Sequence, residues 1–131
     1  MIELNVLLVE DNDDDRYLAT RAMKKLSRPV RLEIARDGAE ALRRLEGDGT
    51  PPAPQLPSLV ILDLQLPRLN GSDVLERLRH NPATRELPVV IASSSDHPDE
   101  LDRCRRLGAA GFIVKPLDAA KLEGLFATLA V

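Results

Sequence analysis

Aromatic residues are scarce in this 131-residue chain, which has no tryptophan, one tyrosine and two phenylalanines. A surface that stacks nucleic-acid bases needs more aromatic rings than that. Cysteine is scarce as well, because Cys104 has no second cysteine with which to form an internal disulfide. We therefore expect a reducing compartment and a buried, inert thiol at this position.

The chain also lacks the segments that direct proteins into or through a membrane. No apolar run approaches the roughly 20 residues of a membrane-spanning helix. A secretory signal requires a cationic start, but the first residues are acidic and read MIELNVLLVEDND. These features predict a cytoplasmic protein with no membrane partner.

An excess of basic charge is missing too, because 18 lysines and arginines stand against 21 aspartates and glutamates, a net charge of −3. This balance argues against a nucleic-acid partner. Hydrophobic residues make up 44% of the chain and charged residues 30%, which is typical of globular proteins. The length fits one domain, so we expect residues 1–131 to fold as a single unit.

Five apolar runs predict five strands. The first, third and fourth runs are almost continuously apolar, which is typical of parallel strands covered on both faces. The second run alternates apolar and polar residues, so we expect it at an edge of the sheet. In chain order the runs are Leu4–Val9, Val30–Ala35, Ser58–Leu62, Pro88–Ala92 and Gly111–Val114.

Helical patterns lie between these runs and after the last one. The first of them places Tyr17, Leu18, Ala22 and Leu26 close to a helical period. Strict alternation of strands and helices favours an α/β fold, a doubly wound parallel sheet with helices on both faces. The expected helices span Asp13–Ser27, Gly38–Glu46, Ser72–His80, Pro98–Leu107 and Asp118–Leu129.

Polar residues follow four of the expected strands. Glu10 and Asp11 follow the first strand, Asp63 the third, Ser93–Ser95 the fourth and Lys115 the fifth. Sites in open α/β sheets form outside the carboxyl ends of the strands. If the first strand lies beside the third, three carboxylates converge there, flanked by a hydroxyl and an ammonium group.

Three neighbouring carboxylates repel one another unless a cation lies between them, and Mg²⁺ prefers oxygen ligands. A carboxylate can also act as the nucleophile in aspartyl-phosphate chemistry. The constellation is therefore typical of a metal-assisted phosphoryl acceptor. Taken singly, the same acids also fit helix caps and dipole partners, and the serines fit turn formers.

The motifs of the chain resemble those of the receiver domain of two-component response regulators. The resemblance covers nearly the whole chain and rests on four segments in order, namely LLVEDN, VILDLQLPRLNG, LPVVIASSS and GFIVKP. It implies a flavodoxin-like (βα)5 fold, a doubly wound five-stranded parallel sheet with strand order 2-1-3-4-5. Because the chain stops just after the fifth expected helix, we expect a stand-alone receiver with no output domain. The resemblance implies that it promotes its own phosphorylation without being a dedicated turnover enzyme.

The resemblance assigns a role to each polar residue at the strand ends. Asp63 is implied to be the phosphoryl acceptor. Asp11 is implied to bind Mg²⁺ or Mn²⁺ directly, and Glu10 through a water molecule. The backbone carbonyl of Gln65 is implied to be a further metal ligand.

Further residues are implied to stabilise the phosphoryl group and to switch. Ser93 and Lys115 match the residues that contact the phosphoryl group, and Phe112 occupies the aromatic switch position. The alternative for Phe112 is an ordinary core residue. The positions of Gln65 and Ser95 are implied to modulate hydrolysis. The bond between Lys115 and Pro116 is expected to be cis.

The resemblance also implies a sensor histidine kinase as partner. The long loop Gly47–Pro57, which holds four of the ten prolines, and the segments around it are similar to stand-alone regulators paired with bacterial phytochrome kinases. Arg16 and Tyr17 are candidate kinase contacts, or simple helix-surface residues.

The fourth helix carries Arg103, Arg105 and Arg106. We expect the face formed by the fourth helix, fifth strand and fifth helix to mediate a homodimer or to dock a target, although a solvated basic face also fits. His80 and His97 have no metal-type spacing and are interpreted as surface residues.

Three other functions fit parts of the sequence. A pseudo-receiver would bind proteins without being phosphorylated, but the set of polar residues is intact. A metal-dependent phosphatase with an aspartate nucleophile usually has a second aspartate two residues later, where this chain has Gln65. A flavin-binding protein would need a phosphate-binding loop after the first strand, where this chain is acidic.

Overall fold

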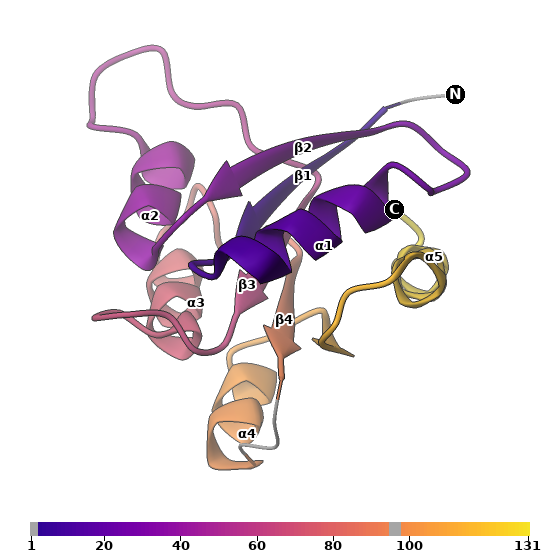
Figure 1. Ribbon diagram of the computed structural model, residues 1–131. Coiled ribbons are helices and arrows are strands. Elements are labelled where there is room, and N and C mark those ends of the chain that lie inside the picture. The colour runs from indigo at the N-terminus through magenta and orange to yellow at the C-terminus, as the bar shows by residue number, and fades with distance from the viewer. Residues whose placement is uncertain (1–2, 95–97) are drawn as a thin grey trace.

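The computed structural model describes residues 3–94 and 98–131, which form one five-stranded parallel sheet flanked by helices (Figure 1). The strand order is β2-β1-β3-β4-β5, as the resemblance implied. The strands are β1 (Leu4–Val9), β2 (Val30–Ala35), β3 (Leu59–Asp63), β4 (Val89–Ser93) and β5 (Gly111–Val114).

Five helices cover the two faces of the sheet. Apolar side chains of α1 and α5 pack on one face, and those of α2, α3 and α4 pack on the other (Figure 1). The helices are α1 (Asp13–Met23), α2 (Gly38–Glu46), α3 (Gly71–His80), α4 (Pro98–Arg106) and α5 (Ala119–Leu129). No helix among the described residues is long and apolar enough to cross a membrane.

Successive side chains of the buried strands pack on opposite faces of the sheet. In β3, Val60 packs with the cluster around α2, α3 and α4, whereas Ile61 packs with the cluster around α1 and α5. This alternation requires apolar residues at every position, as the continuous runs predicted. Each fully buried aliphatic side chain stabilises the fold by about 1.5–3 kcal/mol relative to an exposed one. β2 alternates in burial and lies at an edge, as predicted.

Polar caps begin four of the helices close to the carboxyl edge of the sheet. In each case the side chain of the N-cap residue accepts a hydrogen bond from a backbone N–H three residues later. The N-cap residues are Asn12 for α1, Asp37 for α2, Asn70 for α3 and Asp118 for α5. Each cap fixes the point where the chain leaves a strand and turns into a helix.

The first helix differs from the prediction in length and in its buried face. It ends at Met23 rather than at Ser27, because the following residues form tight turns and the Ser27 amide donates to Glu123 of α5 (2.7 Å). Tyr17 is 63% exposed and Leu18 is also exposed, whereas the buried residues are Ala19, Ala22 and Met23. Of the four residues of the predicted period, Ala22 is buried and Leu26 packs against the same core cluster, whereas Tyr17 and Leu18 are exposed, so the prediction was only partly correct.

Strands β3 and β4 each begin and end one residue later than predicted, so that Asp63 and Ser93 are the last residues of their strands. Both residues are buried. Their backbones therefore belong to the sheet, which fixes where both side chains leave the chain.

Cys104 lies in α4 and is fully buried against the sheet, as predicted. Burial raises the pKa of its thiol to about 11, and the negative charge of Glu100 contributes in the same direction. We expect the native thiol to react with Ellman's reagent at pH 8 about 100-fold or more slowly than the thiol of the chain unfolded in guanidinium chloride, because the thiolate is the nucleophile. Equal rates in the two states would contradict this burial.

Candidate functional site

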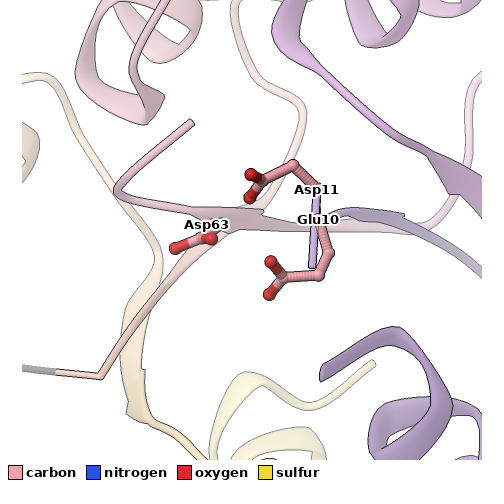
Figure 2. A group of neighbouring side chains, drawn as sticks. All are labelled: Glu10, Asp11 and Asp63. Atoms are coloured by element: carbon pink, nitrogen blue, oxygen red, sulfur yellow. The ribbon is translucent and has the colours of Figure 1, made fainter. Parts of the chain in front are cut away.

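Three carboxylates meet where β1 and β3 end (Figure 2). β1 and β3 are paired in parallel with Val9 opposite Leu62, so the residues that follow these two positions lie side by side. One carboxylate oxygen from each of Glu10, Asp11 and Asp63 lies within 4.8 Å of the others. We call these three residues the acidic site. They are the three acids that the strand ends predicted to converge.

Lys115 supplies positive charge to the acidic site. It follows β5, and its Nζ atom lies 2.6 Å from Glu10 Oε1 and 3.0 Å from Asp63 Oδ2. Because β4 separates β5 from β3, the lysine side chain has to pass the end of β4 to make these contacts. Glu10 and Asp63 are only 3% and 5% exposed, so this ion-pair cluster is largely shielded from solvent.

The protonation equilibria of Glu10 and Lys115 respond to this burial. Burial raises the pKa of Glu10 to about 7; the hydrogen bond from Lys115 opposes the rise and the charge of Asp63 adds to it. Burial alone would lower the pKa of Lys115, but hydrogen bonds and charge from Glu10 and Asp63 outweigh it and raise that pKa. The lysine therefore stays protonated, while the negative charges remain only partly compensated.

Backbone groups hold the carboxylates in place. Asp63 Oδ1 accepts a hydrogen bond from the backbone N–H of Gln65 (3.2 Å), while the side chain of Gln65 is exposed. Glu10 Oε2 accepts one from the Asn12 amide (3.2 Å), and the backbone carbonyl of Glu10 accepts one from Arg16 (3.0 Å). Arg16 also pairs with Asp13. Its guanidinium group is therefore used within the chain.

Ser93 lies at the end of β4, between the strand that carries Asp63 and the strand that precedes Lys115. Its backbone carbonyl accepts a hydrogen bond from the Lys115 amide (2.9 Å). The bond between Lys115 and Pro116 is cis, as expected. Ser95 and His97, which the sequence also singled out, lie outside the described residues.

Phe112 is not the core residue that the alternative interpretation expected. It lies on the edge strand β5, is 37% exposed, and its ring centroid is 5.3 Å from the guanidinium carbon of Arg105, a cation–π contact. Phe112 and Ser93 line one cavity of about 380 Å³, together with Leu101 of α4. The ring therefore lies beside space that also reaches the end of β4.

Of the three arginines of α4, Arg105 and Arg106 are exposed, so the basic face that the sequence suggested is present but lacks Arg103. Arg103 donates hydrogen bonds to Ser72 (2.8 Å), Asp73 (3.1 Å) and Glu76 (2.9 Å), all on α3. Arg105 pairs with Asp102 of its own helix and stacks on Phe112, as described above. Arg103 thus belongs to the contact between α3 and α4.

Sequence reasoning missed one member of the cluster. Asp15, in the first turn of α1, lies with Oδ2 3.1 Å from Lys115 Nζ. The acidic run at the start of α1 predicted only capping and favourable dipole contacts. A signal was present, because Asp15 is four residues before the buried Ala19 and residues so spaced share one face of a helix.

Gly71 allows α3 to begin against the end of β3. A Cβ atom at this position would lie 2.3 Å from the Asp63 carbonyl oxygen and 2.9 Å from Leu64 Cα. The Gly71 amide also donates to the Leu64 carbonyl (2.9 Å). No side chain fits here without moving the backbone that carries Asp63.

We expect Gly71→Ala to lower the free energy of unfolding by about 2 kcal/mol, since overpacking against rigid backbone is destabilising. Gly124→Ala is the matched control, because it lies in α5 and its added Cβ meets no atom within 4 Å. The control should stabilise the protein by about 0.5–1 kcal/mol, as alanine favours helix. Denaturant unfolding measures both, and equal effects of the two substitutions would contradict the close approach.

Comparisons with known proteins give one consistent result. The model of the response regulator receiver domain matches residues 6–127. The probable methanogenesis regulatory protein FilR2 of Methanothrix harundinacea (strain 6Ac) is 36% identical over 121 residues, 90% of this chain and 76% of FilR2. Response regulator Rcp1 of Synechocystis sp. (strain PCC 6803) is 34% identical over 121 residues, 92% of this chain and 80% of Rcp1.

Solved structures agree with these relatives. The phosphorylated cyanobacterial phytochrome response regulator RcpA has a TM-score of 0.79 at 31% identity, covering 98% of this chain and 89% of RcpA. The bacteriophytochrome response regulator AtBRR has a TM-score of 0.78 at 34% identity, covering 100% and 95%. The Mn²⁺-bound form of Rcp1 has a TM-score of 0.77 at 30% identity, covering 96% and 88%.

Proposed function

Because the chain belongs to the response regulator receiver domain family, we propose that a histidine kinase phosphorylates it on Asp63 and that the phosphoryl group changes its affinity for a partner. The observation that carries this proposal is the position of Asp63. Its carboxylate is buried at the end of β3, next to two further carboxylates and 3.0 Å from a lysine ammonium group.

The acidic site fits a hard divalent cation. Three carboxylate oxygens within 4.8 Å of one another match the oxygen ligands that Mg²⁺ and Mn²⁺ prefer. We assign direct contacts to Asp11 and Asp63, a water-mediated contact to Glu10, and a further contact to the backbone carbonyl of Gln65. When bound, the ion supplies positive charge for the carboxylates and for the incoming phosphoryl oxygens. The Mn²⁺-bound form of Rcp1 supports this assignment.

The proposed transfer is a displacement at phosphorus. An oxygen of the Asp63 carboxylate forms the new bond to phosphorus, while the bond from phosphorus to the kinase histidine nitrogen breaks and that nitrogen keeps the electron pair. Lys115 donates to the phosphoryl oxygens, and the Ser93 hydroxyl donates from the end of β4. These residues stabilise charge and position the group, which is most of what phosphoryl transfer requires.

We propose that the switch operates through the cavity beside Ser93 and Phe112. When the Ser93 hydroxyl turns toward the phosphoryl group, the inward position of the Phe112 ring gains population, and the surface around β5 changes. The face of α4, β5 and α5 then binds a partner or a second copy of the chain. Gln65 and Ser95 are proposed to modulate hydrolysis of the acyl phosphate.

The upstream partner is proposed to be a phytochrome-type histidine kinase in the cytoplasm, as the names of the relatives RcpA and AtBRR suggest. Tyr17, exposed on the helix beside the acidic site, is the better candidate contact of the two that the sequence suggested. Arg16 already bonds the Glu10 carbonyl and pairs with Asp13.

The test is intact-mass spectrometry after incubation with acetyl phosphate and Mg²⁺. We expect one phosphoryl group on the wild type and none on Asp63→Asn. Chelation of Mg²⁺ should abolish labelling of the wild type. Asp14→Asn is the control, because Asp14 is exposed on the outer side of the same region and should leave labelling intact.

Labelling of Asp63→Asn, or labelling that ignores chelation, would refute the proposed acceptor and its metal. No labelling of the wild type, even by a histidine kinase that phosphorylates other receivers, would instead favour a binding module that works without phosphate.

A further inference from the structure

The ammonium group of Lys115 contacts three carboxylates, one for each of its N–H bonds. Glu10 comes from the end of β1, Asp63 from the end of β3 and Asp15 from α1, at 2.6, 3.0 and 3.1 Å from Nζ. An ammonium group has three donors and no acceptor, so these contacts use its full capacity. A phosphoryl group that needs Lys115 must therefore take a donor from one of them.

Asp15 differs from the other two carboxylates. Its side chain is 34% exposed, whereas those of Glu10 and Asp63 are buried, and it is not a member of the acidic site. It does not need Lys115 to hold its place, because its amide donates to the Asn12 side chain (2.9 Å) in the cap of α1. A rigid helix start thus presents a carboxylate to the lysine from outside the sheet.

We propose that Asp15 is a positioning residue that competes with the phosphoryl group for Lys115 and thereby limits the phosphorylation of Asp63. This inference rests on the proposed function and adds a residue to it. In the unphosphorylated chain Asp15 holds one donor of Nζ near the rim of the site. During transfer, the ammonium group has to move toward the phosphoryl oxygens, and the Asp15 carboxylate opposes that movement by attraction.

The same contact has a second effect on the acidic site. The ion pair with Asp15 neutralises part of the positive charge of Lys115. Lys115 then binds Glu10 and Asp63 less strongly, and these two carboxylates are more available to a divalent cation. Without Asp15, the ammonium group pairs with these two carboxylates alone. The cation then competes with a stronger ion pair and binds more weakly.

Three variants separate this role from a general effect of charge. Asp15→Asn removes the charge but keeps the size, and Asp15→Glu keeps the charge. Asp14→Asn removes the same charge from the preceding residue of α1. The exposed side chain of Asp14 has no hydrogen bond or ion pair within residues 3–94 and 98–131. Circular dichroism and thermal unfolding verify that all three variants fold.

The first measurement is the rate of phosphorylation by acetyl phosphate at saturating Mg²⁺, followed by intact mass. We expect Asp15→Asn to react about fivefold faster than the wild type, the size of effect expected for one partly exposed ion pair. Asp15→Glu should stay near the wild type. Asp14→Asn should change the rate by much less than Asp15→Asn.

The second measurement needs no phosphoryl donor. Titration with Mn²⁺, followed by its electron paramagnetic resonance signal, should give a dissociation constant about threefold higher for Asp15→Asn than for Asp14→Asn. Asp15→Glu should restore the wild-type value.

The outcomes separate the role of Asp15 from the proposed phosphorylation of Asp63. Equal rates and equal metal affinities of Asp15→Asn and Asp14→Asn would overturn the role of Asp15, even if the wild type is phosphorylated on Asp63. A wild type that binds Mn²⁺ but is not phosphorylated would overturn the proposed function, and with it the competition for a phosphoryl group. The titration would then still decide whether Asp15 controls the charge that Lys115 offers to the acidic site.

Discussion

The largely buried ammonium group of Lys115 pairs with the carboxylates at the ends of β1 and β3. Two carboxylates, Glu10 and Asp63, are almost completely removed from water at the ends of adjacent strands. Like charges in such a place destabilise one another, and the ammonium group of Lys115 is what makes the arrangement tolerable. The unfavourable free energy of burying these charges is offset by apolar packing on both faces of the sheet, where β1, β3 and β4 are buried along nearly their whole length.

The order of the strands turns this local requirement into a site. β1 and β3 are neighbours, so their acids meet; β4 lies next, and Lys115 reaches past its end from the strand beyond. Ser93 therefore ends the strand that lies between the one that carries Asp63 and the one that precedes Lys115. The close start of α3 at Gly71 fixes the same corner from the other side, because its amide bonds the Leu64 carbonyl and an added Cβ atom would lie 2.3 Å from the Asp63 carbonyl oxygen. Glu10, Asp63 and Ser93 lie at or directly after the ends of strands, which suits a site that acts by holding charge in place.

Much of this arrangement could be predicted from the sequence, for reasons that lie in particular segments. The runs ending before Glu10 and Asp63 are almost continuously apolar, which is typical of strands covered on both faces. Polar residues directly after such strands had to lie at one edge of the sheet. The neighbourhood of β1 and β3 came from the resemblance to receivers, because alternation of strands and helices does not by itself give an order.

The remainder depends on the side chains of helices, whose direction a short sequence pattern determines poorly. Tyr17 and Leu18 fit an apolar period together with Ala22, yet both are exposed, and the buried face consists of Ala19, Ala22 and Met23. The basic run of α4 suggested a free surface, but Arg103 is directed at acids of α3 that are about 30 residues earlier in the chain. Asp15 was not predicted, because it belongs to a run of acids that also fits the start of a helix.

The central claim is that Lys115 and Ser93 act on a phosphoryl group carried by Asp63. A crystal structure of the protein with Mg²⁺ and beryllium fluoride tests it most directly, because this salt forms a stable mimic of an acyl phosphate. We predict a trifluoroberyllate group whose beryllium atom is bonded to an oxygen of the Asp63 carboxylate. Lys115 Nζ and the Ser93 hydroxyl should contact its fluorine atoms, and Mg²⁺ should contact Asp11. An unmodified Asp63 that still pairs with Lys115, in crystals that hold Mg²⁺ at the acidic site, would contradict the account.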